Sequence, residues 1–562
     1  MNLAKLFVVT LLFNSLSTLN IKTNINWDDI IRSQSEISST DHISKKIIAV
    51  NQNVVVASTI RVTSDEMSLI GQESTLLYSP QQEDSNRWPL SSPGQESGAN
   101  HIPASENSDN TRDRTSTFLF DIWNSSFSAN GIEAILSCDN TGLCSISGSS
   151  VAFSSSLISS IGLISPFLVM VSDAGLDNLH SRIVLSEVTH TSTSDFLPSF
   201  VDVSHPLSSS SLHPASSSDD SIHSSVGGVS VVGIGLRLSD SCLASGTGPL
   251  FSFGLNGHAS PSPTLTNDLP METALVQSSL VNMSSRSTAA GRESEGSLFG
   301  SNAKQRIVGS EISKSANHQR GTAMLDPNMG GCLVCLNTSF SSCHTHANTG
   351  QAISRKDHVQ GDQFDTSQVT STSVSFTLCT FNEMSMTNSE SFGEAVIHII
   401  DAKADLTVSQ CFFHKCRVTA FAPSGAAIIF SPKIVDQQSI SIEMSSFTEC
   451  QAISTSFMMK IAFAPAFYVK NATTSTLSQN FFHLCNATLR SGAIELDTTD
   501  ATISNCSFVE CAALTQYGGA IGFMSMVSLS LMHTKFRDCS AVTAGSCLLW
   551  QYNPQTHSPM TR

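Results

Sequence analysis

Charged residues are scarce in this chain. Only 13% of its 562 residues are Asp, Glu, Lys or Arg, whereas 40% are hydrophobic. Disordered chains combine low hydrophobicity with high charge, so this balance predicts a folded protein. The net charge is −17, and Lys and Arg form no cluster. Because binding to phosphates needs a basic patch, we expect no nucleic-acid partner.

Long apolar runs are also absent after the N-terminal segment. No later run reaches 18 apolar residues, so we expect no membrane-spanning segment there. Near the start, Lys5 precedes the apolar run from Leu6 to Phe13, and Ser15-Leu16-Ser17 offers small residues for cleavage. This pattern indicates a secretory signal peptide over 1–20 rather than a buried helix or strand, and predicts a secreted or cell-surface protein.

Two further features agree with secretion. Twelve of the fifteen cysteines lie between Cys332 and Cys547, and disulfides form in oxidising compartments. Six N-glycosylation sequons are also present. They begin at Asn124, Asn282, Asn337, Asn471, Asn486 and Asn505.

Composition divides the rest of the chain into segments. Alternating β-branched and polar residues predict strands near the N-terminus, and short apolar runs recur further on without a helical stripe. Stretches rich in Pro, Gly and Ser predict loops. The predicted segments are an N-terminal β segment (21–80), a polar linker (81–114), a diverged β-helix-like region (115–256), a loop-rich connection (257–329), the repeats (330–551) and a polar tail (552–562).

The repeat segment is defined by a recurring phenylalanine. It recurs every 26 to 41 residues, at Phe340, Phe381, Phe413, Phe447, Phe482, Phe508 and Phe536. Three residues later six of the seven units have a cysteine, and Met384 takes its place in the other. These cysteines are Cys343, Cys416, Cys450, Cys485, Cys511 and Cys539. Small or polar residues precede the phenylalanine by two, and apolar ones by five.

The register of these positions predicts the fold. Inward side chains on a strand recur every two residues. Positions −7 and −5 share one parity, −2 and 0 the other, and +3 and +5 return to the first, so the chain must bend twice in each unit. Each unit is then three short strands joined by bends, or one coil of a parallel β-helix. Like positions stack between coils and build a continuous core.

A glycine motif supplies the next turn of the coil. It reads Gly-Gly-Ala-Ile at 518–521, with the variants SGAI at 491–494 and SGAAI at 424–428. Glycine allows the positive φ that tight turns need. A helical repeat is the alternative for such periods, but the units lack apolar residues at i, i+3, i+4 and i+7.

The combined pattern, apolar-x-apolar-x-x-small-x-Phe-x-x-Cys-x-Ala followed by Gly-Gly-Ala-Ile, resembles the right-handed parallel β-helix family with the pectin-lyase-like fold. It is especially similar to the repeats of polymorphic outer-membrane proteins, whose hallmarks are GGAI and Phe-x-x-Asn. Here Cys replaces that Asn, and the match covers 330–550. Residues 45–255 resemble the diverged N-terminal portion of secreted, Ser-rich β-helix proteins of eukaryotic microbes. The resemblance implies an all-β solenoid with long Ser/Pro/Gly-rich loops.

The fold also hosts polysaccharide lyases and hydrolases, which need converging carboxylates. The polygalacturonase-like set of Asn-Thr-Asp, Asp-Asp, Gly-His-Gly and Arg-Ile-Lys is not assembled here. Asp497 and Asp500 are the one carboxylate pair in a recognisable coil. We therefore predict no catalytic site, no cofactor and no enzyme activity.

The cysteines leave two alternatives open. Cys332, Cys335, Cys343, His344 and His346 have a spacing reminiscent of zinc ligands. Cys335 and Cys343 fall on core positions held by Phe or Met in other units, so we predict packing rather than a metal site. Cysteines stacked on adjacent coils could form disulfides or remain buried thiols, and the sequence does not choose.

From this architecture we expect a non-catalytic, secreted or surface solenoid that presents an extended binding or adhesion surface to glycans or proteins. A carbohydrate-active enzyme and a structural spacer are the alternatives.

Overall fold

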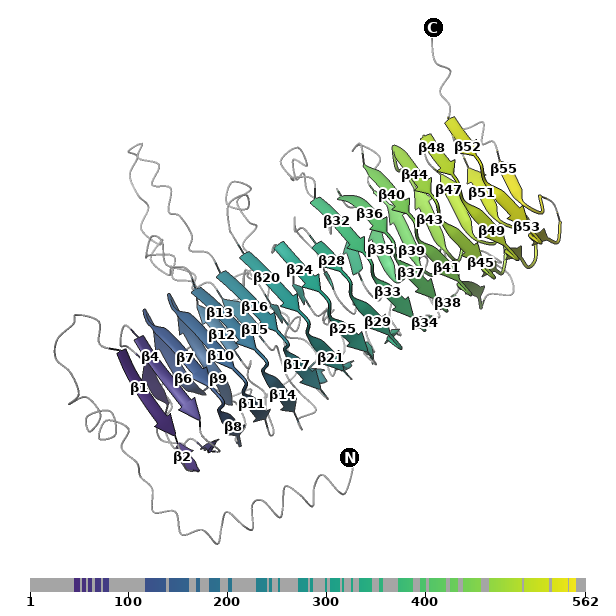
Figure 1. The fold of residues 1–562 in the computed structure, drawn as a ribbon. Helices are drawn as coiled ribbons and strands as arrows, with labels where there is room; N and C mark the ends of the chain where they lie inside the picture. Colours follow the sequence, from purple (N-terminus) through teal and green to yellow (C-terminus); the bar gives the residue numbers. More distant parts are fainter. Residues whose placement is uncertain are drawn as a thin grey trace, which may run out of the picture.

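The computed structural model describes residues 45–79, 117–204, 229–252, 271–326 and 333–551, with gaps between the strands named below. The predicted signal peptide, polar linker and polar tail lie outside these residues, as does the sequon at Asn282. All the elements described are β-strands, and they stack into a long rod (Figure 1). Helices long and apolar enough to cross a bilayer are absent from the described residues.

The strands form five parallel sheets, here called A to E. Sheet A contains β1 (Lys45–Val50), β4 (Glu66–Gly71), β7 (Ser126–Asn130), β10 (Ser150–Ser154), β13 (Ser181–Ser186), β16 (Val229–Ile234), β20 (Met271–Val276), β24 (Lys304–Val308), β28 (Leu333–Leu336), β32 (Thr372–Thr377), β36 (Ala404–Ser409), β40 (Ser439–Glu443), β44 (Thr474–Ser478), β48 (Asp500–Ser504) and β52 (Ser528–Met532). Sheet B contains β2 (Val54–Val56), β5 (Thr75–Tyr78), β8 (Glu133–Leu136), β11 (Leu157–Ser160), β14 (Thr189–Ser192), β17 (Arg237–Ser239), β21 (Ser279–Val281), β25 (Glu311–Ser313), β29 (Ser339–Ser341), β33 (Thr380–Asn382), β37 (Phe412–His414), β41 (Ser446–Thr448), β45 (Phe481–His483), β49 (Ser507–Val509) and β53 (Lys535–Arg537).

The other three sheets complete each coil. Sheet C contains β3 (Ile60–Val62), β6 (Thr117–Trp123), β9 (Thr141–Ser147), β12 (Leu168–Val171), β15 (Val201–Ser204), β19 (Phe251–Ser252), β23 (Phe299–Gly300) and β27 (Leu325–Asp326). Sheet D contains β18 (Cys242–Ala244), β22 (Ser284–Arg286), β26 (Ala316–Asn317), β30 (His344–Thr345), β34 (Ser385–Thr387), β38 (Arg417–Ala420), β42 (Gln451–Ser454), β46 (Asn486–Ala487), β50 (Ala512–Ala513) and β54 (Ser540–Ala541). Sheet E contains β31 (Ile353–Lys356), β35 (Ile397–Ile400), β39 (Ile428–Ser431), β43 (Phe467–Lys470), β47 (Ile494–Asp497), β51 (Ile521–Met524) and β55 (Leu548–Gln551).

The architecture is a parallel β-helix, which confirms the predicted fold class. The chain passes from sheet A to sheet B, then through sheet D from β18 onward, and then to sheet C or E before returning to A. Sheets A and B each have 15 strands, one for every coil. Both sheets run from β1 and β2 to β52 and β53 without a break, so the N-terminal strands and the C-terminal repeats share one solenoid. Strands β20 to β27 fall within 257–329, where the sequence suggested mostly loop.

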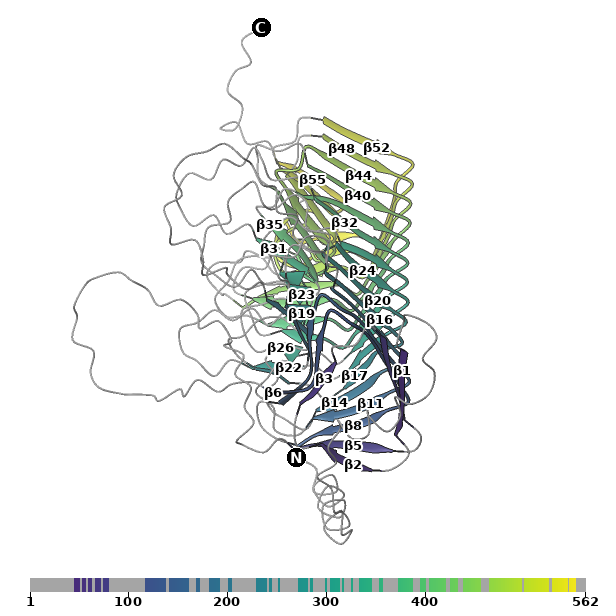
Figure 2. The same ribbon diagram turned by 90° about the vertical axis from the view of Figure 1, so that its left-hand side faces the viewer.

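Single residues in the left-handed conformation make the bends between sheets. In the coil that contains β37, Gln410 and Lys415 have φ of 54° each. The left-handed residue Gln410 changes which alternate residues point inward. Val408 before the bend is therefore buried, and so are Cys411 and Phe413 after it. This is the parity change seen in the sequence. Figure 2 shows these bends stacked in a regular row along one edge of the rod.

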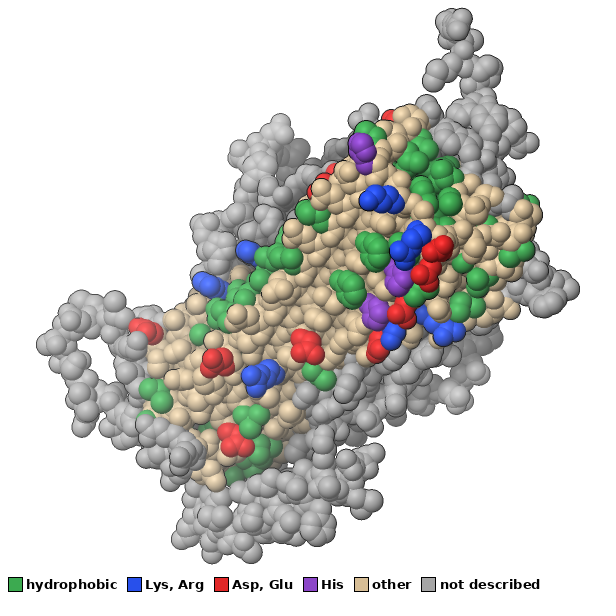
Figure 3. All heavy atoms as spheres, turned by 45° about the vertical axis from the view of Figure 1, so that its right-hand side comes forward, with side chains coloured by type: hydrophobic (Ala, Val, Ile, Leu, Met, Phe, Trp, Pro, Cys, Tyr) green, Lys and Arg blue, Asp and Glu red, His purple; other side chains and the backbone are tan. Residues whose placement is uncertain are grey.

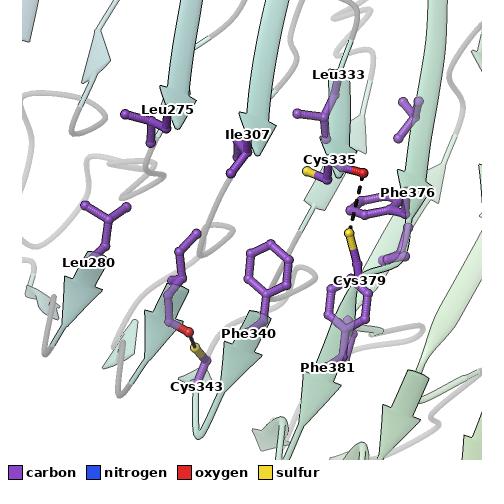
Figure 4. Packing of buried hydrophobic residues seen from close by; sticks show 14 of the residues in the cluster. Leu275, Leu280, Ile307, Leu333, Cys335, Phe340, Cys343, Phe376, Cys379 and Phe381 are labelled. Atoms are coloured by element: carbon purple, nitrogen blue, oxygen red, sulfur yellow. Dashed lines mark hydrogen bonds between the residues drawn. The ribbon is translucent and has the colours of Figure 1, made fainter. Parts of the chain in front are cut away.

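The core consists of columns that run along the rod axis. Above Phe340 the rings of successive coils stack nearly parallel, with centroids 4.6 Å apart for Phe381–Phe413 and 5.1 Å for Phe508–Phe536. In the coils on the N-terminal side of Phe340, this position holds smaller side chains. The full column is Val54, Leu76, Ala134, Ile158, His190, Leu238, Leu280, Ile312, Phe340, Phe381, Phe413, Phe447, Phe482, Phe508 and Phe536. Figure 4 shows the transition from aliphatic to aromatic rungs.

The Gly-Gly-Ala-Ile motif has a separate reason for each glycine. Gly518 has φ of 71°, which a residue with a side chain rarely adopts. A Cβ on Gly519 would collide with the backbone oxygens of Ser546 and Ser540 in the next coil. Ala520 and Ile521 are fully buried. The motif therefore lets sheet D turn into sheet E where two coils approach closely.

Candidate functional site

The column cysteines are part of the packing. No disulfide is formed by any of the cysteines whose side chains the structure describes. Each column thiol is a weak donor to the carbonyl oxygen of the column phenylalanine, or its equivalent, in the preceding coil. The distance from Cys485 Sγ to Phe447 O, for example, is 3.5 Å. Burial raises the pKa of the Cys450 and Cys485 thiols well above its ordinary value. Such thiols are neutral and have little reactivity as nucleophiles.

The residues with zinc-like spacing lie in three places, and His344 is the first residue of β30, where it pairs with Ala316 and Ser385. Cys335 and Cys343 are buried in the core, while Cys332 and His346 lie outside the described residues. A Cys379 thiol donates to the carbonyl of Cys335 (Figure 4). No group of three or more His, Cys, Asp or Glu side chains within the described ranges could hold a metal ion.

The sequons fall mostly at bends. Asn124, Asn337 and Asn505 are exposed and have positive φ. Asn471 is half-buried at a similar bend, and Asn486 is half-buried in β46. Asparagine tolerates this conformation better than most residues, so its presence at these bends also has a purely structural reason.

A buried carboxyl group lies on the outer side of sheet E. Glu495 follows the SGAI motif on β47 and is 1% exposed. The Ser491 hydroxyl donates to Glu495 Oε2 at 2.9 Å. In register with it are Tyr468 on one neighbouring coil and Gly522 on the other. A Cβ at position 522 would collide with the Ser491 hydroxyl, so this glycine leaves room for the Ser491–Glu495 contact.

Burial controls the ionisation of this carboxyl. It raises the pKa of Glu495 to about 7, Asp497 adds to the rise, and Ser491 and Arg490 oppose it. Burial also raises the pKa of Asp497, against the effect of Lys470. Among the described residues, no group donates a hydrogen bond to Oε1 of Glu495. A neutral carboxyl can donate a proton, but at 1% exposure Glu495 does not reach a polymer outside the rod.

A second feature lies on the outer face of sheet B. The outward side chains of β37, β41 and β45 form a surface that we call the Phe/His face, which consists of Phe412, His414, Ser446, Thr448, Phe481 and His483. Phe412 and Phe481 are each 41% exposed. Each ring stacks on the histidine two residues on, with centroids 5.8 Å apart for Phe412–His414 and 5.9 Å for Phe481–His483.

Two bends extend this apolar surface. Leu378 and Met444, at the bends between sheets A and B, are 49% and 46% exposed. Figure 3 shows one side of the rod, on which histidine side chains lie among acidic and basic ones in the C-terminal half, while hydrophobic side chains occur along its whole length. Exposed aromatic and aliphatic groups that cluster on one face mark interaction sites.

Comparisons with known proteins give no further information on either feature. No family model, curated protein or solved structure matches this chain.

Neither the buried Glu495 nor the Phe/His face is predicted from the sequence, although both leave a signal in it. The tripeptide Phe-Phe-His occurs twice, at 412–414 and 481–483. The register puts its central residue in the core and therefore turns its outer two residues to solvent. Likewise Glu495 directly follows Ile494 of the SGAI motif, at an outward position. Asp497 and Asp500, the carboxylate pair in the sequence, lie on different strands, β47 and β48.

Proposed function

We propose that this protein is a non-catalytic, secreted or cell-surface solenoid of the pectin-lyase-like type, which binds extracellular glycans or proteins. The Phe/His face carries this proposal. Two exposed phenylalanines on neighbouring parts of one sheet expose apolar area that a monomeric rod would otherwise bury. Aromatic side chains are common anchors at binding surfaces.

Backbone rigidity supports the same role. Each strand that carries the face is hydrogen-bonded to a strand on either side. The backbone at Phe412 and Phe481 is thus fixed before a ligand arrives, so binding has to order only side chains.

The proposal is tested with arrays of glycans and of extracellular proteins. We expect the wild-type protein to bind at least one class, and the double variant Phe412→Ser, Phe481→Ser to lose that binding. Trp123→Ser is the matched control, because Trp123 is 55% exposed on β6, a strand of sheet C in the N-terminal part of the rod. Undiminished binding by the double variant, or equal loss in the control, would contradict the proposal.

A further inference from the structure

From β33 to β53, the outward side chains of sheet B alternate in size. Bulky pairs stand on every second strand, and small ones stand between them. From β33 to β53 the pairs are Thr380/Asn382, Phe412/His414, Ser446/Thr448, Phe481/His483, Ser507/Val509 and Lys535/Arg537.

The alternation sets a fixed spacing between the aromatic rings. Phe412 is paired in register with Ser446, and Ser446 with Phe481. Neighbouring strands lie about 4.8 Å apart, so equivalent atoms of the two Phe/His pairs are about 9.6 Å apart along the rod axis. Between them, Ser446 and Thr448 leave a low polar strip.

That spacing matches a linear polymer of sugars. In an extended β-linked pyranose chain each sugar is turned over relative to the last, so the same face recurs at every second sugar, after about this distance. The face of an aromatic ring carries partial negative charge, which attracts the slightly positive C–H hydrogens on the face of a sugar ring. Histidine, serine and threonine beside the rings offer hydrogen bonds to sugar hydroxyls.

Charge on this surface decides between neutral and acidic polymers. In sheet B, the outward positions of β33, β37, β41, β45 and β49 include no Asp, Glu, Lys or Arg. The bend column at one edge contains Glu383, Glu449 and Glu510. The same column contains Lys415, whose Nζ is 3.9 Å from Glu383 Oε1. Asp538 adds a fourth acidic group to this column, and Lys415 and the exposed Arg417 on β38 are basic groups beside it. A border with an excess of negative charge repels polyanions.

The shape of the face favours a linear ligand over a globular protein. Its strands are three residues long, so two outward residues span about 7 Å across the track. A stable protein interface covers about 800 Å² on each partner, which is far wider than this strip.

We propose that the ligand is a neutral, extended, β-linked polysaccharide that lies along the rod axis, with alternate sugars on Phe412 and Phe481. This inference rests on the proposed function and names the ligand class for the same face. The shortest chain that reaches both rings has three sugars.

Calorimetry with β-1,4-linked gluco-, manno- and xylo-oligosaccharides of one to six sugars tests the inference. For at least one series, we expect affinity to rise sharply when the third sugar is added. Phe412→Ala or Phe481→Ala should remove that step and weaken binding of the hexasaccharide roughly 5- to 10-fold. Polygalacturonate should bind more weakly than the neutral chains.

A spacing variant supplies the matched control. Ser446→Phe combined with Phe481→Ser keeps two exposed phenylalanines but moves them to adjacent strands, about 4.8 Å apart. The step at three sugars should disappear in this variant while the circular dichroism spectrum is unchanged. An unchanged step, or no dependence on length in any series, overturns the inference.

The outcomes separate the two proposals. If the array ligand is a protein or a compact glycan, and its binding is lost in the double serine variant, the polysaccharide inference is wrong and the proposed function stands. If the double serine variant loses no ligand, both are wrong.

Discussion

Individual residues in this fold accept unfavourable conformations because the coil imposes them. Leu378, Gln410 and Met444 all occupy left-handed bends where glycine has no steric penalty. Each bend nevertheless forms a hydrogen bond to the next coil, as the Leu378 N–H does to Ser409 O at 3.0 Å. The stacking of coils therefore outweighs local backbone preference.

Replacing Leu378 with glycine should stabilise the protein by about 1 kcal/mol, because the left-handed strain disappears and the Leu378 N–H bond remains. The side chain that is removed is half exposed, so little packing is lost. The urea midpoint of unfolding measures the effect. Thr407→Gly, at an exposed position inside β36, is the control and should lower the midpoint. A lower midpoint for Leu378→Gly would show that the bend carries no strain.

Glu495 makes stability depend on pH. Its pKa is raised from 4.5 to about 7, so the folded state prefers the neutral carboxyl. This contribution is fully present below pH 4.5 and is lost as pH rises to about 7, with a magnitude of about 3 kcal/mol. Glu495→Gln should therefore stabilise the protein at pH 8 and have little effect at pH 4.

Thermal unfolding of the two proteins between pH 4 and pH 8 checks this prediction. Burial lowers the pKa of His190 to about 3, and this histidine acts in the opposite direction, with stability lost as pH falls below about 6.5. His190 is present in both proteins, so its effect cancels in the difference. A difference that does not change with pH would mean that Glu495 is ionised without penalty.

At the scale of elements, the turn into sheet E combines two constraints that look identical in the sequence. Gly518 favours the left-handed φ of this turn, and Gly519 is needed for the close approach of the next coil. The corresponding residues one coil earlier are Ser491 and Gly492. Ser491 takes φ of 52° and uses its hydroxyl to bond Glu495.

The two glycines should respond differently to substitution. Gly518→Asn should be tolerated, because asparagine enters the left-handed region readily. Gly519→Ala should be strongly destabilising, by about 3 kcal/mol or more, because its Cβ meets fixed backbone atoms. Chemical denaturation of both variants tests the assignment. Equal effects would mean that one mechanism acts at both positions.

Much of this element structure was predictable from the register of Phe508, Cys511 and their equivalents, because buried positions repeat every two residues. The N-terminal coils were harder to recognise. There the same column contains Ala134, Ile158 and Leu280, which any strand could bury, so no single residue type marks the repeat. The outward Phe412 and Phe481 were hidden because an adjacent core phenylalanine accounted for the sequence pattern.

At the scale of the whole molecule, each coil contacts only its neighbours. Stability is then close to a sum of coil and interface contributions. At the C-terminal end of the described rod, Phe536 and Cys539 are only partly buried, whereas Phe508 and Cys511 one coil earlier are buried.

Removing the last coil should leave the rest folded. A chain that ends at Met524, after β51, should keep a strand-rich circular dichroism spectrum and lose only a few degrees of melting temperature. A chain that ends at Val509 cuts the preceding coil after sheet B, and should lose more stability because sheet E is left incomplete. Complete unfolding of the Met524 chain would show that the solenoid is stable only as a single cooperative unit.

From β7 to β53, every connection between sheets A and B is two residues long. Coil length therefore varies only in the other connections, and the strands of sheets A and B keep a constant spacing along the rod. Outward residues on these strands can be substituted without disturbing the backbone. A Phe–His pair introduced on β29 at Ser339/Ser341, or on β53 at Lys535/Arg537, would extend the Phe/His face by one more aromatic pair at the same two-strand spacing.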